Sequence, residues 1–259
     1  MENPIRVAMF QMNIVWKDVD TNLKKLKSWL MSHKGETDLV VVPEMFSTGF
    51  CVDALDLSED SRLQTISQLQ NWSDETDVAI VGSLMYAENG THYNRAFFIA
   101  PHQSLVYYDK HHLFRMGSEG VYFSSGKKRV IVEYKGWRFL MQVCYDLRFP
   151  VFSRIRNNDY DVILYVACWP QSRVGAWNIL LPARAVENLC YVCGVNASGV
   201  DDAGRTQAGH STLIDMKGEI LSQLGDNEED SIVELSKEKL EKFRTKFPVW
   251  KDADEFNLK

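Results

Sequence analysis

The sequence lacks the segments that mark secreted, membrane and nucleic-acid-binding proteins. Residues 1–6 pass directly into a strand-like pattern, without the charged and apolar regions of a secretory signal. No apolar run approaches the roughly 20 residues that a membrane span needs. The net charge is −6, and no run of Lys and Arg stands out. These absences predict a cytoplasmic protein whose partners include neither a membrane nor nucleic acid.

The sequence also gives no sign of a disulfide framework or of a boundary between domains. The five cysteines are an odd number and, without an export signal, fit a reducing cytosol better than a disulfide framework. No stretch rich in Pro, Gly and Ser divides the chain, and no repeat of fixed period appears. With 259 residues, 45% of them hydrophobic, the chain can bury a sizeable core without a metal or a disulfide. We predict one domain spanning residues 1–259.

Several catalytic motifs are absent as well. There is no Gly-x-Ser-x-Gly, so a serine hydrolase has no support. GVYFSSGK (residues 120–127) resembles a phosphate loop, but it has five residues between its glycines, and Lys128 stands where Ser or Thr is required. His111 and His112 are adjacent, so on an extended chain they point to opposite sides, and no HExxH or paired CxxC motif occurs. We expect no metal and no cofactor.

The hydrophobic pattern that is present predicts an α/β protein. Strands over residues 5–11, 38–43 and 78–85 alternate with helices over 17–32 and around 63–69, which implies parallel pairing. Further strands are predicted over residues 95–100, 105–108, 129–134, 139–143, 162–166, 191–196, 211–215 and 219–221, and further helices over 176–188 and 237–243. This number of strands is too large for one open sheet to hold comfortably.

Three segments place a reactive or charged side chain beside a strand. Glu44 ends a buried apolar run, Lys110 follows a strand, and Cys144 stands where an apolar strand meets a polar turn. Ligand sites in α/β sheets lie beyond the carboxyl ends of strands, so all three positions suit a pocket. Taken singly, each has a plain alternative: a solvated glutamate, a surface lysine, and a cysteine that packs as a small hydrophobe.

Together with their neighbours, these residues resemble the nitrilase superfamily of carbon-nitrogen hydrolases, which carries a Glu-Lys-Cys triad. The matching segments occur in the family's order: PEMFSTGF (43–50), YDKHHLF (108–114), GSEGVYFSSG (117–126), VCYDLRFP (143–150), ARAVEN (183–188) and GHSTLID (209–215). Within the superfamily the chain is most similar to omega-amidases, which hydrolyse 2-oxoglutaramate and 2-oxosuccinamate to the 2-oxo diacid and ammonia. The resemblance implies a four-layer α-β-β-α sandwich and a homodimer or higher homo-oligomer.

The resemblance also implies a role for each residue of the triad. Cys144 attacks the amide carbon, and Glu44 takes the thiol proton and returns it to the leaving ammonia. Lys110 and the backbone N–H of Tyr145 stabilise the oxyanion. Water then cleaves the thioester with Glu44 as base. Glu119 matches a second glutamate that orders the lysine.

The far end of an omega-amide substrate carries a carboxylate, which an arginine can hold bidentately. Arg173, in the loop after the strand ending near residue 166, is the candidate, with Trp169 and Phe46 as further substrate-binding residues. Pro182 lies inside the helical stretch that leads to ARAVEN and should kink or delay this helix, which leaves the position of Trp177 open.

Arg148 and Arg184 are alternative carboxylate ligands. Both lie in segments that look like scaffold, where they are expected to pair with Asp146 or Glu187. The sequence therefore leaves the carboxylate partner open between three arginines.

Other functions share parts of this pattern. A deaminated glutathione amidase or an N-carbamoyl amine hydrolase would differ at the pocket rim, over residues 46–50, 119–123 and 168–177. A binding or scaffolding protein would have no need of a nucleophile, a base and an oxyanion cation together. A thiol-redox protein would need a resolving cysteine near Cys144, and the sequence offers none nearby. Cys190 and Cys193 spell CxxC, but an i, i+3 pair in a strand faces opposite ways.

Overall fold

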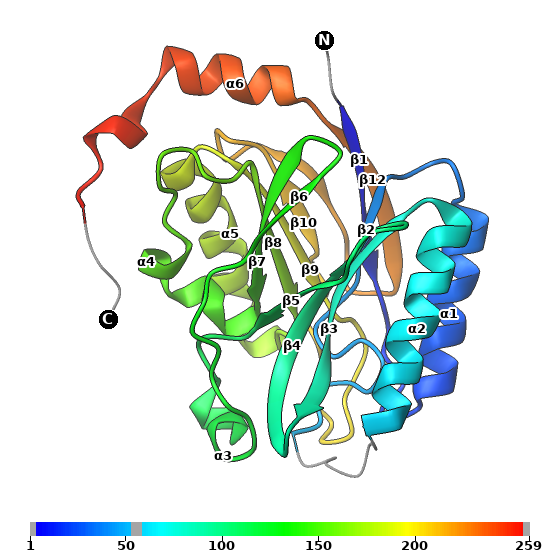
Figure 1. The fold of residues 1–259 in the computed structure, drawn as a ribbon. Helices are drawn as coiled ribbons and strands as arrows, with labels where there is room; N and C mark the ends of the chain where they lie inside the picture. The colour runs from blue at the N-terminus through cyan, green and yellow to red at the C-terminus, as the bar shows by residue number, and fades with distance from the viewer. Residues whose placement is uncertain (1–3, 53–58, 256–259) are drawn as a thin grey trace.

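The computed structural model describes residues 4–52 and 59–255, which form two six-stranded sheets packed face to face (Figure 1). The first sheet has, in spatial order, β12 (Glu229–Leu235), β1 (Ile5–Gln11), β2 (Leu39–Val41), β3 (Ala79–Glu88), β4 (Thr91–Ile99) and β5 (Val106–Asp109). The second has β11 (Ile220–Gln223), β10 (Thr212–Ile214), β9 (Tyr191–Asn196), β8 (Val162–Ala167), β7 (Trp137–Val143) and β6 (Ile131–Tyr134).

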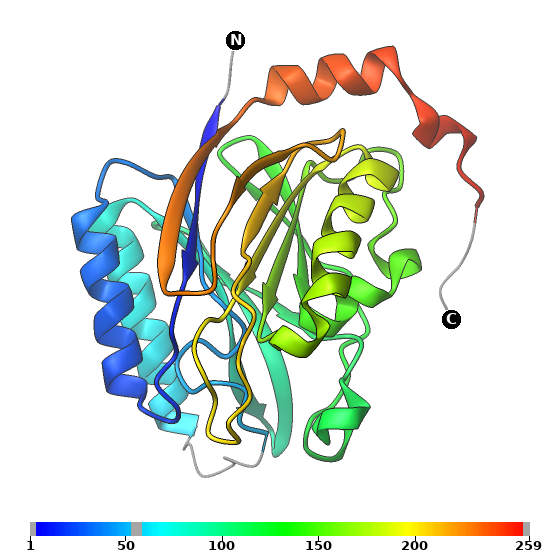
Figure 2. The same cartoon turned by 180° about the vertical axis from the view of Figure 1, so that it is seen from behind.

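Helices cover the outer faces of both sheets, which confirms the predicted α-β-β-α sandwich (Figures 1 and 2). The helices are α1 (Val19–Ser32), α2 (Glu59–Thr76), α3 (Glu119–Tyr122), α4 (Pro150–Ser153), α5 (Val174–Asn188) and α6 (Lys237–Lys246), with 3₁₀ turns η1 (Arg115–Gly117), η2 (Cys144–Arg148), η3 (Gln171–Arg173) and η4 (Val249–Asp252). α1 and α2 lie on the first sheet and α5 on the second. None of the helices in the described part of the chain has the length and apolarity to cross a membrane.

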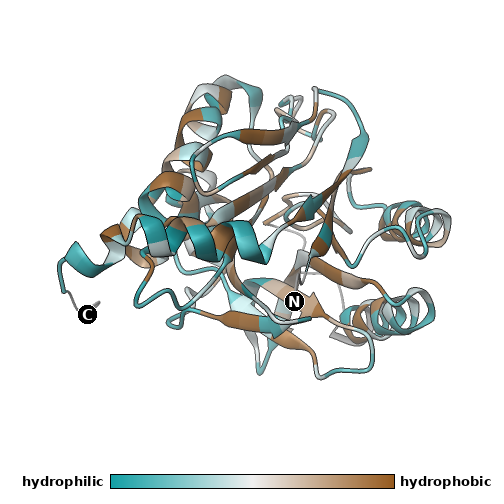
Figure 3. Cartoon of the chain, turned by 90° about the horizontal axis from the view of Figure 1, so that it is seen from above, coloured by the Kyte–Doolittle hydropathy of each residue, from teal (hydrophilic) through white to brown (hydrophobic). Residues whose placement is uncertain are grey.

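The core consists of apolar side chains packed between these elements, and the view from above shows how many of the strand residues are hydrophobic (Figure 3). Strand β8 illustrates why its sequence is continuously apolar. Val162, Leu164 and Val166 face the other sheet, whereas Ile163 and Tyr165 pack against the layer that contains α5. Because strands of this kind are covered on both faces, every position along them must be apolar.

Two elements differ from the sequence-based prediction. The sequence of β12 is largely polar and was not predicted as a strand, but it pairs antiparallel with β1 along its whole length, from Ile5 opposite Leu235 to Gln11 opposite Glu229. An edge strand needs only a few buried side chains, so its pattern is weak. Helix α2 is also longer than predicted, and it begins at Glu59.

Helix α5 runs through Pro182 and begins at Val174, so the proline does not delay it as the sequence suggested. Pro182 removes one backbone donor, but the helix is held by burial of Leu181 and Ala185 on its inner face. Trp177 on the same face is fully buried, and its Nε1 donates to the carbonyl of His210 at 2.9 Å.

Gly126 fixes the strand end that carries Lys110. Its backbone N–H donates to the Lys110 carbonyl at 3.0 Å, and a β-carbon at residue 126 would lie 2.0 Å from the carbonyl oxygen of Asp109. Only glycine allows this approach.

We therefore expect Gly126→Ala to lower the free energy of unfolding by about 1–3 kcal/mol and to reduce catalysis, because Lys110 must move. Chemical denaturation and kcat measurements check this. Gly175→Ala is the matched control, because a β-carbon there meets no atom within 4 Å. An equal response of the two variants would contradict the importance of this contact.

Candidate active site

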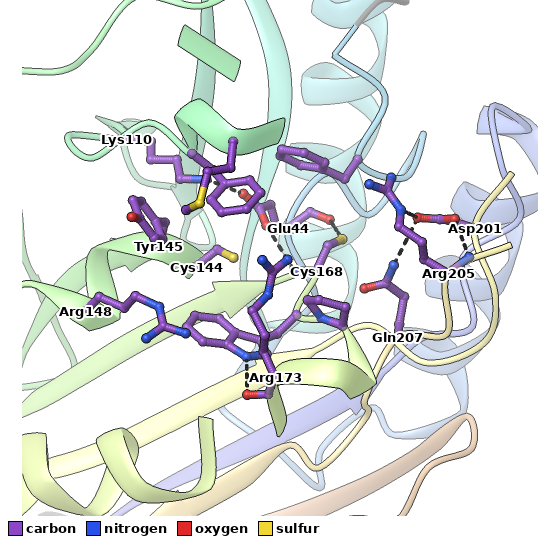
Figure 4. Close-up of a pocket in the computed structure, with 15 residues that line it drawn as sticks. Glu44, Lys110, Cys144, Tyr145, Arg148, Cys168, Arg173, Asp201, Arg205 and Gln207 are labelled. Carbon is purple, nitrogen blue, oxygen red and sulfur yellow. Dashed lines mark hydrogen bonds and ion pairs between the residues drawn. The ribbon is translucent and has the colours of Figure 1, made fainter. Parts of the chain in front are cut away.

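The site forms where strands of both sheets end (Figure 4). Glu44 lies in the turn after β2, and Lys110 directly follows β5. From the opposite sheet, Cys144 directly follows β7 and Cys168 directly follows β8. Parallel strands place these carboxyl ends at one edge, and the packing of the sheets brings the two edges together. Residues far apart in the sequence thus line one cavity.

Lys110 is held between two carboxylates in a fully buried group. Its Nζ lies 2.8 Å from Oε1 of Glu44 and 3.0 Å from Oε2 of Glu119, and all three side chains have no exposed surface. Burial alone would lower the pKa of Lys110, but Glu119, Glu44 and the neighbouring Cys144 raise it well above its ordinary value. Lys110 is therefore a permanent cation in the wall of the cavity.

The carboxylate of Glu44 accepts hydrogen bonds at both oxygens. Oε1 accepts from Lys110 and from Nδ2 of Asn94 at 2.7 Å, and Oε2 accepts from the backbone N–H of Cys168 at 2.9 Å. These donors fix the carboxylate in one orientation. A carboxylate anion held in place is what a general base requires.

Cys144 is a protonated thiol placed beside that base. Burial raises the pKa of the Cys144 thiol well above its ordinary value, and the charge of Glu44 and a hydrogen bond to Glu44 raise it as well. The positive charge of Lys110 lowers it, but by less. The thiol must therefore lose its proton as it attacks, and Glu44 is the acceptor at hand. The backbone of Cys144 has φ 44°, a conformation that non-glycine residues rarely adopt and that clusters at functional sites.

Tyr145 follows Cys144 in the first turn of η2 and lines the cavity. The first N–H groups of a helix have no partner within it. The backbone N–H of Tyr145 is thus a suitable oxyanion donor. The structure brings Glu44, Lys110, Cys144 and Glu119 together as the resemblance implied.

Asn94, on β4, is a member of this group that the sequence did not reveal. Its Nδ2 donates to Oε1 of Glu44 at 2.7 Å and to Oε1 of Glu119 at 2.9 Å. Its Oδ1 accepts from Oγ of Ser83, which in turn accepts from the backbone N–H of Met45. This chain of bonds sets the direction of the amide. An asparagine inside a strand carries no motif, so only the fold could identify it.

The cavity beside Cys144 has a volume of about 320 Å³ and is lined on one side by arginine and aromatic side chains. Arg173 extends into it towards Cys144 and Glu44 (Figure 4), and its guanidinium lies 4.9 Å from the ring centre of Phe114. Trp169 also lines the cavity, as predicted.

Two expectations about the pocket are wrong. Phe46 does not reach the cavity, because it is fully buried between the first sheet and its helices, against Phe97; Phe50 from the same segment lines the cavity instead. Arg148 does not pair with Asp146 but lines the cavity, with its guanidinium 5.1 Å from the ring centre of Trp169.

Asp146 instead binds groups that hold the turn around Cys144 in place. It accepts from Tyr108 Oη at 2.7 Å, from Nδ1 of His112 at 2.8 Å and from the backbone N–H of Val143 at 3.0 Å. Arg184 is buried and pairs with Glu187 at 3.2 Å, as expected of a scaffold residue.

The two adjacent histidines have packing roles. His111 stacks on Phe152, and His112 stacks on Phe149 and binds Asp146. The described residues contain no group of three or more His, Cys, Asp or Glu side chains that could hold a metal ion.

A second cysteine, Cys168, lines the same cavity, contrary to the expectation that no thiol lies near Cys144. Its Sγ donates to the carbonyl of Glu44 at 3.1 Å. Burial and the charge of Glu44 raise its pKa well above the ordinary value. Cys168 thus acts as a neutral donor that supports Glu44, not as a second thiolate.

Residues 6–245 match the carbon-nitrogen hydrolase family. The omega-amidase YafV of Yersinia enterocolitica is 41% identical over 255 residues, which cover 98% of each chain. The 2-oxoglutaramate amidase of Bacillus subtilis is 29% identical, over 95% of this chain and 96% of the relative. The crystal structure of XC1258 from Xanthomonas campestris, a CN-hydrolase superfamily protein with an arsenic adduct in its active site, matches with a TM-score of 0.96, 38% identity and 99% coverage of both chains.

The hydrogen bonds of Asn94 to Glu44 and Glu119 lead to a kinetic prediction. Asn94→Ala removes one donor from each carboxylate without touching the cavity, so kcat should fall about 10- to 100-fold while KM changes little, given 1.5–3 kcal/mol for a hydrogen bond to a charged group. Steady-state kinetics on any amide that the protein hydrolyses measures both constants.

Asn188→Ala is the control, because Asn188 is equally buried but binds only the backbone and Glu187, away from the site. It should lose stability and keep kcat. If Asn94→Ala lost only stability, the proposed link to the two carboxylates would be refuted.

Proposed function

The chain belongs to the carbon-nitrogen hydrolase family and is an amidase of the nitrilase superfamily, and we propose that it is an omega-amidase that hydrolyses the terminal amide of 2-oxoglutaramate and 2-oxosuccinamate. The observation that carries this proposal is the buried Lys110–Glu44 ion pair beside the Cys144 thiol, at the wall of a cavity that also holds arginines. The similarity to the Yersinia omega-amidase and the Bacillus 2-oxoglutaramate amidase supports the substrate.

We propose a reaction in two steps. Sγ of Cys144 attacks the amide carbon while Glu44 takes the thiol proton, and the oxyanion is stabilised by Lys110 and the N–H of Tyr145. The C–N bond breaks as Glu44 gives its proton to the leaving nitrogen, so ammonia departs and a thioester remains. Water then attacks the thioester, Glu44 takes the water's proton, and the carboxylic acid leaves as Cys144 regains a proton.

The arginines of the cavity favour a substrate with an acidic far end. Arg173 and Arg148 both line the cavity, and among the described residues neither forms an ion pair with a carboxylate; their guanidinium groups lie over aromatic rings. A substrate carboxylate can therefore bind them without displacing a protein partner, and a bidentate bond to Arg173 would hold the amide carbon near Cys144.

We also propose that two chains associate through the outer face of α5 and that the protein works in the cytoplasm. Ile179 and Val186 on this helix are 71% and 48% exposed, and Val151 nearby is 51% exposed, which is unusual for apolar side chains on one side of a molecule. Analytical ultracentrifugation tests this interface: we expect the wild type to sediment as a dimer and Ile179→Asp to sediment as a monomer.

An ammonia-release assay over small amides tests the function directly. We expect release from 2-oxoglutaramate and 2-oxosuccinamate to exceed release from deaminated glutathione and from N-carbamoyl amines. Cys144→Ala should reduce turnover below a few per cent, and its stability should change far less than after a large core truncation, because one sulfur at a partly exposed site is removed. A preference for a carbamoyl amine, or turnover by Cys144→Ala, would refute the proposed substrate or nucleophile respectively.

The proposed bond between Arg173 and the substrate carboxylate leads to a separate prediction. Arg173→Ala should lower kcat/KM for 2-oxoglutaramate about 10- to 100-fold, because the charged hydrogen bond that it removes contributes about 1.5–3 kcal/mol. The kcat/KM for a neutral amide of similar length should change much less. Parallel kinetics on both substrates measures the difference. Equal losses on the two would remove Arg173 from the substrate site.

A further inference from the structure

The two groups that stabilise the oxyanion in the proposed reaction are carried by different sheets. Lys110 directly follows β5 of the first sheet, whereas the backbone N–H of Tyr145 belongs to η2, which follows β7 of the second sheet. Both residues line the cavity beside Cys144 (Figure 4). An adduct on Cys144 can bind both donors only if each is held in place relative to the other, because a displacement of about 1 Å can slow catalysis about a hundredfold.

Asp146 connects the two segments that carry these donors. It lies two residues after Cys144, and its side chain has no exposed surface. Oδ2 accepts from the hydroxyl of Tyr108 at 2.7 Å, and Oδ1 accepts from the backbone N–H of His112 at 2.9 Å and from its Nδ1 at 2.8 Å. Tyr108 and His112 stand two residues before and two residues after Lys110. A single carboxylate thus holds the Lys110 segment on both sides.

The same carboxylate holds the turn that carries the nucleophile. Oδ2 of Asp146 accepts from the backbone N–H of Val143 at 3.0 Å, across the bend in which Cys144 has φ 44°. The N–H of Tyr145 lies within this bend, so its direction depends on the bond that closes it. Burial and the charge of Asp146 raise the pKa of Tyr108 well above its ordinary value, so the Tyr108 hydroxyl keeps the proton that it donates.

We propose that Asp146 is a positioning residue that fixes the backbone N–H of Tyr145 relative to Lys110 and so sets the geometry of the oxyanion site. The inference rests on the proposed function, because it needs an oxyanion to form on Cys144. Tyr108 and His112 share the role, since each supplies a donor to one oxygen of Asp146. Neither of these two side chains lines the cavity, so their bonds can be removed without changing a group that touches the substrate.

Tyr108→Phe and His112→Phe test this role, because each removes one donor and keeps an aromatic ring. His112 stacks on Phe149, and a phenyl ring can stack in the same place. We expect kcat for 2-oxoglutaramate to fall about tenfold or more in both variants, because a displaced donor binds the oxyanion less well, while KM changes little. Should one variant fail to fold, the other decides the outcome.

An aldehyde separates positioning from a merely structural role. In 2,5-dioxopentanoate an aldehyde replaces the amide of 2-oxoglutaramate. Sγ of Cys144 adds to the aldehyde carbon, and the thiol proton passes through Glu44 to the aldehyde oxygen, which then occupies the oxyanion site; no group leaves. In both variants its Ki should rise by about the factor by which kcat/KM falls. The Ki of 2-oxopentanoate, which ends in a methyl group and makes no hydrogen bond there, should stay within about twofold of the wild-type value.

Tyr160→Phe is the matched control, because Tyr160 is as deeply buried as Tyr108 and its hydroxyl donates to the carbonyl of Ser153, outside the cavity. It should lose stability and keep kcat and both inhibition constants. Unchanged kcat in the Tyr108 and His112 variants, a fall in kcat with an unchanged Ki of the aldehyde, or equal rises in Ki for both inhibitors would overturn the role of Asp146.

The outcome for the substrate is separate from the outcome for Asp146. If the wild type hydrolysed another amide of the ammonia-release panel in place of 2-oxoglutaramate, the proposed substrate would fall. The aldehyde and the methyl compound that correspond to that amide would then serve the same comparison, and the same results would support or overturn the role of Asp146.

Discussion

The buried ammonium of Lys110 is the constraint on which the site depends. An isolated charge would be costly to remove from water, and Lys110 is fully buried only because Glu44 and Glu119 lie within 3.0 Å of it. Two carboxylates around one cation leave an excess of negative charge, which the amide of Asn94 and the backbone N–H of Cys168 offset by hydrogen bonds. Burial, together with this excess of negative charge, raises the pKa of the Cys144 thiol and keeps it protonated until a base removes its proton.

The two-sheet architecture makes this arrangement possible. Glu44, Asn94 and Lys110 belong to the first sheet or the turns after its strands, whereas Cys144 and Cys168 follow strands of the second. The apolar layer between the sheets fixes the distance between these groups, since residues on both inner faces form one buried cluster. A rigid scaffold of this kind holds the thiol and its base in position.

The long apolar runs of the sequence predicted most of the layers, and the resemblance to the nitrilase superfamily predicted the group of Glu44, Lys110, Glu119 and Cys144. The sequence could not predict contacts made through the fold. Asn94 looks like any polar residue in a strand until β4 is placed beside Glu44 and Glu119. Phe46 was predicted to bind the substrate, but its side chain packs in the cluster between the first sheet and its helices. The mainly polar β12 pairs through its backbone, which leaves no hydrophobic pattern.

A covalent link between substrate and Cys144 is the feature that separates this mechanism from direct attack by water. Mass spectrometry of the protein quenched within milliseconds of mixing with 2-oxoglutaramate measures it, followed by mapping of the modified peptide. We expect an added mass equal to the substrate less ammonia, carried by the peptide that contains Cys144 and lost as turnover ends. Steady turnover without any adduct, or an adduct on Cys168 in place of Cys144, would contradict the role assigned to the buried Lys110–Glu44 pair and its thiol.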